Sequence, residues 1–127
     1  MLPPAFIGQM QALLGSESEA FFDALLRQPA PPSIRLNPAK RAALPHAPAK
    51  AVPWCAHGFY LAQRPASFTL DPLLHAGAYY VQEASSMFIA HLARQLAGEA
   101  PLAALDLCAA PGGKATLLAS CLPEGSL

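Results

Sequence analysis

The chain has 127 residues, of which 54% are hydrophobic and 13% charged, and its formal net charge is zero. This length fits about one small domain, and the composition is that of a globular protein rather than a disordered one. No apolar run approaches the roughly 20 residues of a membrane-spanning helix. Because no secretory signal is evident and the three cysteines form no CxxC pair, we expect a cytoplasmic protein without disulfides or a zinc site.

The first thirty residues have the pattern of two helices. Apolar side chains recur at helical spacing from Pro3 to Leu14, and Gly15 suits a C-terminal cap. Ser16 and Glu19 have the spacing of a capping box, with Ser16 as the N-cap and Glu19 at the third helical position, which predicts a second helix that runs to about Arg27. A proline-rich stretch then ends that helix.

The middle of the chain predicts short strands separated by loops. Apolar and polar residues alternate from Ser33 to Asn37, which indicates a half-buried strand. The segment from Ala39 to Pro53 is rich in alanine and proline and predicts a loop, with one helical turn near Lys40 to Leu44. Short strands are predicted at Gly58 to Leu61 and at Phe68 to Leu70.

Two further helices are predicted after these strands. Asp71 and Pro72 suit the N-cap and the first position of a one-turn helix. Tyr79 to Gln82 is expected to be extended. The next helix is expected from about Glu83 to Leu96, and Gly98 stops it.

A run of nine residues, Asp106 to Lys114 (DLCAAPGGK), is the most informative part of the sequence. The apolar run Leu102 to Leu107 leads into it and predicts a strand, whereas Ala115 to Leu122 predicts a helix. The order strand, glycine-rich turn, helix is how α/β proteins build nucleotide-type ligand sites at the carboxyl end of a strand.

The chemistry of this turn favours an anionic guest. Gly112 and Gly113 can adopt φ > 0 and let a ligand approach the backbone. The following helix presents unpaired N–H groups and the positive end of its dipole, which suit a carboxylate or a phosphate. Lys114 either pairs with that anion or stays solvated. Upstream, Gln82 and Ser85 either cap their helix, the interpretation we favour, or contact a substrate or order this turn.

Known phosphate motifs do not fit the turn. A P-loop needs a hydroxyl residue after its lysine and a glycine five positions before the second one, but Ala115 and Cys108 stand there. The dinucleotide pattern fails because Cys108 and Ala110 replace its first glycines. An Asp-led turn of the kind that holds S-adenosylmethionine remains, beside a purely structural strand-to-helix turn.

The complete string Asp106 to Lys114 resembles the S-adenosylmethionine-binding motif of the Sun-type RNA (cytosine-5)-methyltransferases. Gly77 to Met87 is similar to the segment that precedes the cofactor strand in that family, and Ser33 to Asn37 is similar to its Arg-x-Asn strand. The stretch from Val52 to Gly77 resembles in particular the bacterial RsmF-like subgroup, which methylates 16S rRNA. The similarity thus covers nearly the whole chain, in the correct order.

This resemblance implies an α/β protein in two parts. Residues 1–68 are expected to form a small N-terminal α+β domain, and residues 69–127 the truncated beginning of a Rossmann-like methyltransferase domain. The implied reaction transfers a methyl group from S-adenosylmethionine to C5 of a cytosine in RNA, with 16S rRNA as the partner. The resemblance assigns cofactor binding to Cys108, Ala109, Ala110, Pro111, Gly112, Gly113 and Lys114.

The resemblance assigns no catalytic residue to this chain. Enzymes of the family use a cysteine nucleophile and a second cysteine, in Pro-Cys and Thr-Cys contexts downstream of the cofactor motif. The cysteines here, Cys55, Cys108 and Cys121, follow tryptophan, leucine and serine. We therefore expect the nucleophile to lie outside this chain. The chain is expected to be a fragment of a longer protein and to be inactive by itself.

The charge pattern keeps a second function open. A chain that binds RNA strongly by itself is usually basic, and this one is neutral. Arg35, Lys40, Arg41 and Lys50 cluster either as a modest RNA-facing patch or as solvated loop charges. The alternative function is a stand-alone RNA-binding or assembly module without catalysis, in which the glycine turn is only structural.

Overall fold

The computed structural model describes residues 2–40 and 47–126. The chain divides into two compact units, Met1–Ala30 and Pro31–Leu127. The domain boundary expected between residues 68 and 69 stays a prediction, because a sequence domain need not coincide with a compact unit. The helical turn expected near Lys40 to Leu44 falls mostly outside the described residues. None of the described helices is long and apolar enough to cross a bilayer.

The first unit is a pair of helices, α1 (Pro4–Leu14) and α2 (Ser18–Arg27), joined by a 3₁₀ turn at Gly15–Glu17. Within this unit the rings of Phe6 and Phe21 lie 6.4 Å apart between centroids. Both helices and the terminating Gly15, with φ of 54°, agree with the sequence prediction.

The predicted capping box is wrong in its details. Ser16 lies inside the 3₁₀ turn rather than before a helix, and no side-chain bond caps α2. Ser18 instead donates its hydroxyl proton to the carbonyl of Gly15, over 2.8 Å. The Ser-x-x-Glu spacing is present, but the tight turn after α1 places the helix start one residue further on.

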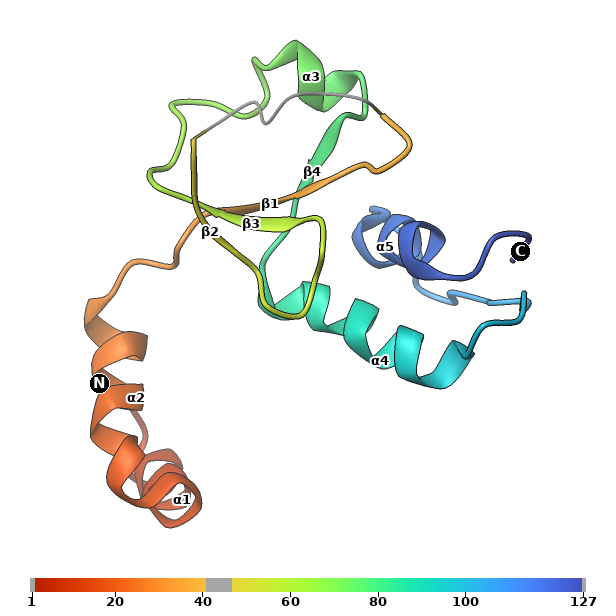
Figure 1. Cartoon of the computed structure of the whole chain (residues 1–127). Coiled ribbons are helices and arrows are strands. Elements are labelled where there is room, and N and C mark those ends of the chain that lie inside the picture. Colours follow the sequence, from red (N-terminus) through yellow and green to blue (C-terminus); the bar gives the residue numbers. More distant parts are fainter. Residues whose placement is uncertain (1, 41–46, 127) are drawn as a thin grey trace. The chain divides into compact units, whose positions relative to one another are not determined.

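The second unit contains a four-stranded antiparallel sheet in the order β2-β3-β1-β4 (Figure 1). Its strands are β1 (Ser33–Leu36), β2 (Pro48–Ala51), β3 (Gly58–Leu61) and β4 (Tyr79–Val81). Strand β1 is central, so that Ile34 faces Phe59 on one side and Val81 on the other.

The central strand is buried on both faces, not half-buried as predicted. Ser33, Ile34 and Arg35 are all at most 4% exposed. Ile34 packs on one side with Leu61, Ala78 and Tyr79, whereas Arg35 bonds on the other side to helix α5 (Gly113–Cys121). Alternation was therefore a sound signal of a strand, but it did not reveal the helix that covers the polar residues.

Two other strand predictions are corrected. Strand β2 lies in the alanine- and proline-rich segment predicted as a loop, and it is strand because it pairs with β3. Residues 68–70 form a turn rather than a strand. There Phe68 packs against the cluster around Ile34, so that its apolar side chain is partly buried without any strand pairing.

The short helix α3 (Pro72–His75) follows the predicted cap. Asp71 accepts a hydrogen bond from the backbone N–H of Leu73 at 2.9 Å. Its other carboxylate oxygen accepts one from the Tyr79 hydroxyl at 2.7 Å. The predicted N-cap and helical proline are thus confirmed, and the cap also ties α3 to the start of β4.

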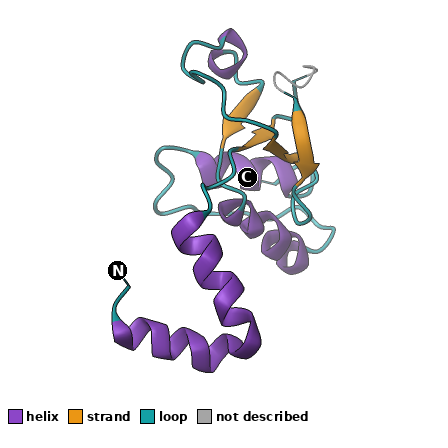
Figure 2. Cartoon of the chain, turned by 90° about the vertical axis from the view of Figure 1, so that its left-hand side faces the viewer, coloured by secondary structure: helices purple, strands orange, loops and turns teal. Residues whose placement is uncertain are grey.

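Helix α4 (Phe88–Ala97) and helix α5 lie side by side beneath the sheet (Figures 1 and 2). A 3₁₀ turn at Ser85–Met87 precedes α4, so the helix begins later than predicted, and Gly98 ends it with φ of 63°. Met87 and Leu117 are at most 1% exposed in the core between them. That core also contains Val52, Cys55, Ala84 and Ala90.

The strand predicted at Leu102 to Leu107 is not formed. Residues 101–106 have no regular structure, and none of the strands in the described residues pairs with them. Leu105 and Leu107 are 84% and 85% exposed. A strand needs a hydrogen-bonded neighbour, and the antiparallel sheet places none beside this segment.

We predict that Gly58→Ala destabilises the second unit by about 1–3 kcal/mol, because it overpacks the core. A Cβ at this buried position would lie 2.7 Å from the Met87 sulfur and 3.0 Å from Cβ of Val52. Urea unfolding of the 127-residue chain, followed by Trp54 fluorescence, measures the change. The matched control is Gly8→Ala in α1, where a Cβ meets nothing within 4 Å; an unaltered midpoint for Gly58→Ala would contradict the packing shown.

Candidate functional site

The turn before α5 begins at Asp106. One oxygen of its carboxylate, Oδ1, accepts a hydrogen bond from the N–H of Cys108 at 3.0 Å, which bends the chain as an Asx turn. The other, Oδ2, is buried and has no hydrogen-bond partner among the described residues. Asp106 therefore fixes the start of the turn and retains a free acceptor.

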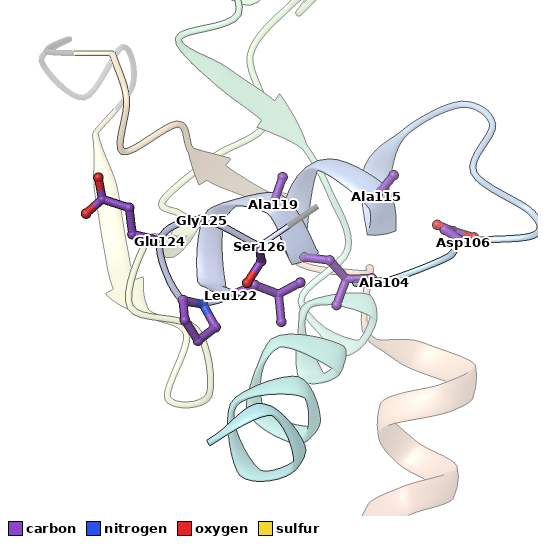
Figure 3. A pocket seen from close by; sticks show the side chains of 10 residues that line it. Ala104, Asp106, Ala115, Ala119, Leu122, Glu124, Gly125 and Ser126 are labelled. Carbon is purple, nitrogen blue, oxygen red and sulfur yellow. The ribbon is translucent and has the colours of Figure 1, made fainter. Parts of the chain in front are cut away.

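Asp106 also lines a pocket of about 300 Å³, which is formed by residues 104 and 106, helix α5 and residues 122–126. Figure 3 shows its carboxylate at one end of this pocket. Ala115 and Ala119 of α5, and Leu122 directly after that helix, line the pocket as well. The walls are mainly small and apolar, and the other polar side chains that line the pocket are those of Glu124 and Ser126.

The glycine pair divides its tasks between its two members. Gly112 is the N-cap residue of α5 and has φ of 107°, a conformation that side chains rarely tolerate. Gly113 lies within the helix and does not have a positive φ, so the left-handed conformation considered for both is confirmed only at Gly112. A Cβ at Gly113 would lie 3.4 Å from the Tyr80 ring.

The amides that follow Gly112 have free hydrogens. The first helical hydrogen bond of α5 runs from Thr116 N–H to the Gly112 carbonyl, at 2.9 Å. The preceding amides, of Gly113, Lys114 and Ala115, therefore have no partner within the helix, and no acceptor for them lies elsewhere in the described parts of the chain. Such a helix start attracts a carboxylate or a phosphate.

A second pocket, of about 280 Å³, lies beside this turn, and we call it the turn pocket. Of the seven residues predicted to bind cofactor, all but Gly112 line it: Cys108, Ala109, Ala110, Pro111, Gly113 and Lys114. The opposite wall consists of Tyr80, Val81, Gln82, Glu83 and Ser86. The structure thus brings the predicted residues together, while their role in binding stays a prediction.

Arg35 enters the site from the central strand, although it is only 3% exposed. Its Nε donates to Oε1 of Gln82 at 2.8 Å, and its Nη2 donates to Oγ1 of Thr116 at 2.6 Å. Burial lowers the pKa of the guanidinium, an effect opposed by the nearby Cys55, Cys121 and Tyr80 side chains. No carboxylate in the described residues pairs with Arg35.

This burial corrects the interpretation of the basic cluster. Arg35 cannot belong to an exposed RNA-facing patch, whereas Lys40 and Lys50 are exposed and Arg41 lies outside the described residues. Sequence reasoning missed the contact between Arg35 and Thr116. The available signals were an arginine between two apolar strand residues and a hydroxyl four residues after Gly112.

Gln82 orders the turn instead of capping a helix. Its Nε2 donates to the Gly113 carbonyl at 3.1 Å, and its own backbone carbonyl accepts from the Ser33 hydroxyl at 2.7 Å. Of the interpretations left open for this residue, contact with the turn is the one found. Ser85 lies in the 3₁₀ turn before α4 and does not line the turn pocket.

The three cysteines differ in their burial. Cys55 is buried, Cys108 is exposed within the turn, and Cys121 is half-buried. Burial raises the pKa of the Cys121 thiol, with a smaller opposing effect from Arg94. No group of three metal-ligating side chains occurs within the described residues.

Solved structures share the fold of this chain. The crystal structure of the protein PH0851 superimposes with a TM-score of 0.71 at 25% sequence identity, over 94% of this chain and 28% of that one. A methyltransferase homolog from Pyrococcus horikoshii matches with a TM-score of 0.55 at 29% identity, over 95% of this chain and 45% of that one. The predicted α/β class is thereby confirmed.

Sequence comparison gives the family. Ribosomal RNA small subunit methyltransferase F of Serratia proteamaculans is 33% identical over 94% of this chain, and that of Aliivibrio fischeri (strain MJ11) is 37% identical over 94%. The chain spans 27–28% of the length of these relatives. Residues 2–84, more than half of the chain, match the N-terminal domain of 16S rRNA methyltransferase RsmF. The chain therefore belongs to the RsmF N-terminal domain family.

Proposed function

We propose that this chain is the N-terminal part of an S-adenosylmethionine-dependent methyltransferase that acts on C5 of a cytosine in 16S rRNA in the cytoplasm. The observation that carries the proposal is the match of residues 2–84 to the RsmF N-terminal domain. It is supported by the order of that domain and the glycine turn, which follows at residues 106–114.

The turn has amides that suit one of the charged groups at the methionine end of S-adenosylmethionine. That end carries a carboxylate and an ammonium group. The free amides after Gly112 suit the carboxylate, whereas the unpaired Oδ2 of Asp106 is buried and lines the other pocket. The cofactor would supply an electrophilic methyl group, and the residues proposed to hold it are those from Cys108 to Lys114.

The RNA substrate is proposed for the whole protein rather than for this chain alone. Phosphate contacts dominate RNA affinity, and a chain with zero net charge supplies little of that attraction. The relatives whose names specify ribosomal RNA are much longer than this chain. Nothing in the structure favours the alternative of a stand-alone RNA-binding module.

We predict that S-adenosylmethionine shifts the amide NMR signals of residues 108–110 and 112–114 in the 127-residue chain, and that Gly112→Val weakens binding at least about tenfold, or ~1.4 kcal/mol. A β-branched residue is strained at the φ of 107° found at this position, so the amides that follow would be displaced. Titration of isotope-labelled protein measures both effects.

The matched control is Gly98→Val, because Gly98 also has a positive φ, of 63°, and has open space around it. It imposes a similar backbone strain at the end of α4, and we expect cofactor affinity to be retained. Equal affinity of the Gly112→Val and unmodified proteins would contradict the assignment of the turn.

We further predict that the isolated chain transfers no methyl group to 16S rRNA. Its cysteines lack the sequence contexts of the family's nucleophile, and Cys55, the most enclosed of them, is 3% exposed. The measurement is incorporation of radiolabelled methyl from S-adenosylmethionine into the RNA. Formation of 5-methylcytosine by this chain would show that a residue outside the expected contexts is the nucleophile.

A further inference from the structure

Arg35 reaches both carbonyls of the glycine pair through intermediary side chains. It is one of the few buried charged or polar residues of the second unit, and its strongest hydrogen bonds go to Thr116 and Gln82. Each of these two groups passes a hydrogen bond on to the turn. The two paths end at Gly112 and at Gly113.

The first path runs through a hydroxyl. Nη2 of Arg35 lies 2.6 Å from Oγ1 of Thr116, which in turn lies 2.7 Å from the carbonyl oxygen of Gly112. A guanidinium only donates hydrogen bonds. The Thr116 oxygen must therefore accept from Arg35, which leaves its own proton directed at Gly112.

The second path runs through an amide. Nε of Arg35 donates to Oε1 of Gln82 at 2.8 Å, and Nε2 of Gln82 donates to the Gly113 carbonyl at 3.1 Å. The same donor-only character of arginine fixes which end of the Gln82 amide faces it. Nη2 also approaches the Gly113 carbonyl directly, at 3.5 Å.

Anchored carbonyls determine where the next amides point. In a planar trans peptide the C=O of one residue and the N–H of the next point in opposite directions. Holding the carbonyls of Gly112 and Gly113 therefore sets the directions of the N–H groups of Gly113 and Lys114. These are two of the free amides available to an anion at the start of α5.

We propose that Arg35, acting through Thr116 and Gln82, is a positioning residue that orients the ligand-binding amides of the glycine turn. This role rests on the proposed function of the turn, because the amides matter only if a ligand uses them. It also gives the buried arginine a task that reaches beyond the packing of α5 on the sheet.

The test compares Thr116→Val with Thr116→Ser in the 127-residue chain. Valine is similar in shape to threonine and keeps the backbone N–H that donates to Gly112, but it removes the hydroxyl proton that also reaches this carbonyl, whereas serine retains it. We expect the NMR order parameters of the Gly113 and Lys114 amides to fall from about 0.85 to below about 0.6 in Thr116→Val. We also expect S-adenosylmethionine affinity to fall about tenfold, with Thr116→Ser within twofold of the unmodified protein on both measures.

Two further variants separate orientation of the turn from general stability. Ser120→Ala removes another hydroxyl that Arg35 approaches, at 3.5 Å, but one whose proton goes to Leu117 rather than to a glycine. We expect it to leave the order parameters unchanged. Gln82→Glu retains an acceptor for Arg35 but loses the donor to Gly113, so the Lys114 amide should become mobile while the urea midpoint does not fall.

Unchanged order parameters in Thr116→Val, or an equal drop in Ser120→Ala, would overturn the proposal and leave Arg35 with a supporting role in the fold. The order parameters are measured without any ligand. A chain that does not bind S-adenosylmethionine but shows the expected loss of order would therefore count against the proposed function alone.

Discussion

The buried guanidinium of Arg35 is the interaction on which the second unit depends. Removing a charge from water is costly unless hydrogen bonds replace the lost hydration, and Arg35 is only 3% exposed. Its hydrogen bonds go to Gln82 and to α5, at Gly113, Thr116 and Ser120. If α5 moved away, water would have to replace these acceptors, and a hydrogen bond to a charged group contributes about 1.5–3 kcal/mol. The position of the helix is therefore coupled to this one residue.

The two faces of β1 have different roles: one packs in the apolar core, and the other faces α5 and the glycine turn. Ile34 is fully buried in the apolar cluster with Leu61 and Tyr79, which fixes the strand in the sheet. Arg35, the next residue, faces α5 and the glycine turn, because successive strand side chains point to opposite faces. A shift of one residue in the pairing of β1 would place the charge in the apolar cluster. The register that builds the core is thus also the register that places Arg35.

Sequence reasoning succeeded where the signal is local. The Asp71 cap, the helix ends at Gly15 and Gly98, and the strand around Ile34 each depend on a few neighbouring residues. It failed where a partner decides the conformation. Strand β2 is exposed along its whole length and is a strand only because it pairs with β3. In the same way, residues 102–107 have strand-like composition but no neighbouring strand.

The candidate site follows the same division. Its turn could be predicted because nine consecutive residues carry the pattern. Because these residues are neighbours in the chain, most of them line the same pocket. The hydrogen bonds from Arg35 to Gln82 and Thr116 could not be predicted, because these two acceptors are 47 and 81 positions away in the chain. A sequence shows an arginine in a strand, but not the distant atoms that its donors reach.

The composition of the turn explains why such distant support is needed. Ala109, Ala110, Gly112 and Gly113 carry no functional side-chain groups, so a ligand can recognise them only through the backbone. Backbone recognition is selective only if the peptide planes have a fixed direction. Arg35 and Gln82 lie inside the segment that matches the RsmF N-terminal domain, whereas the glycines and Thr116 lie after it. Residues 31–84 of the family domain and the turn are therefore joined by these hydrogen bonds, and both lie in the second compact unit.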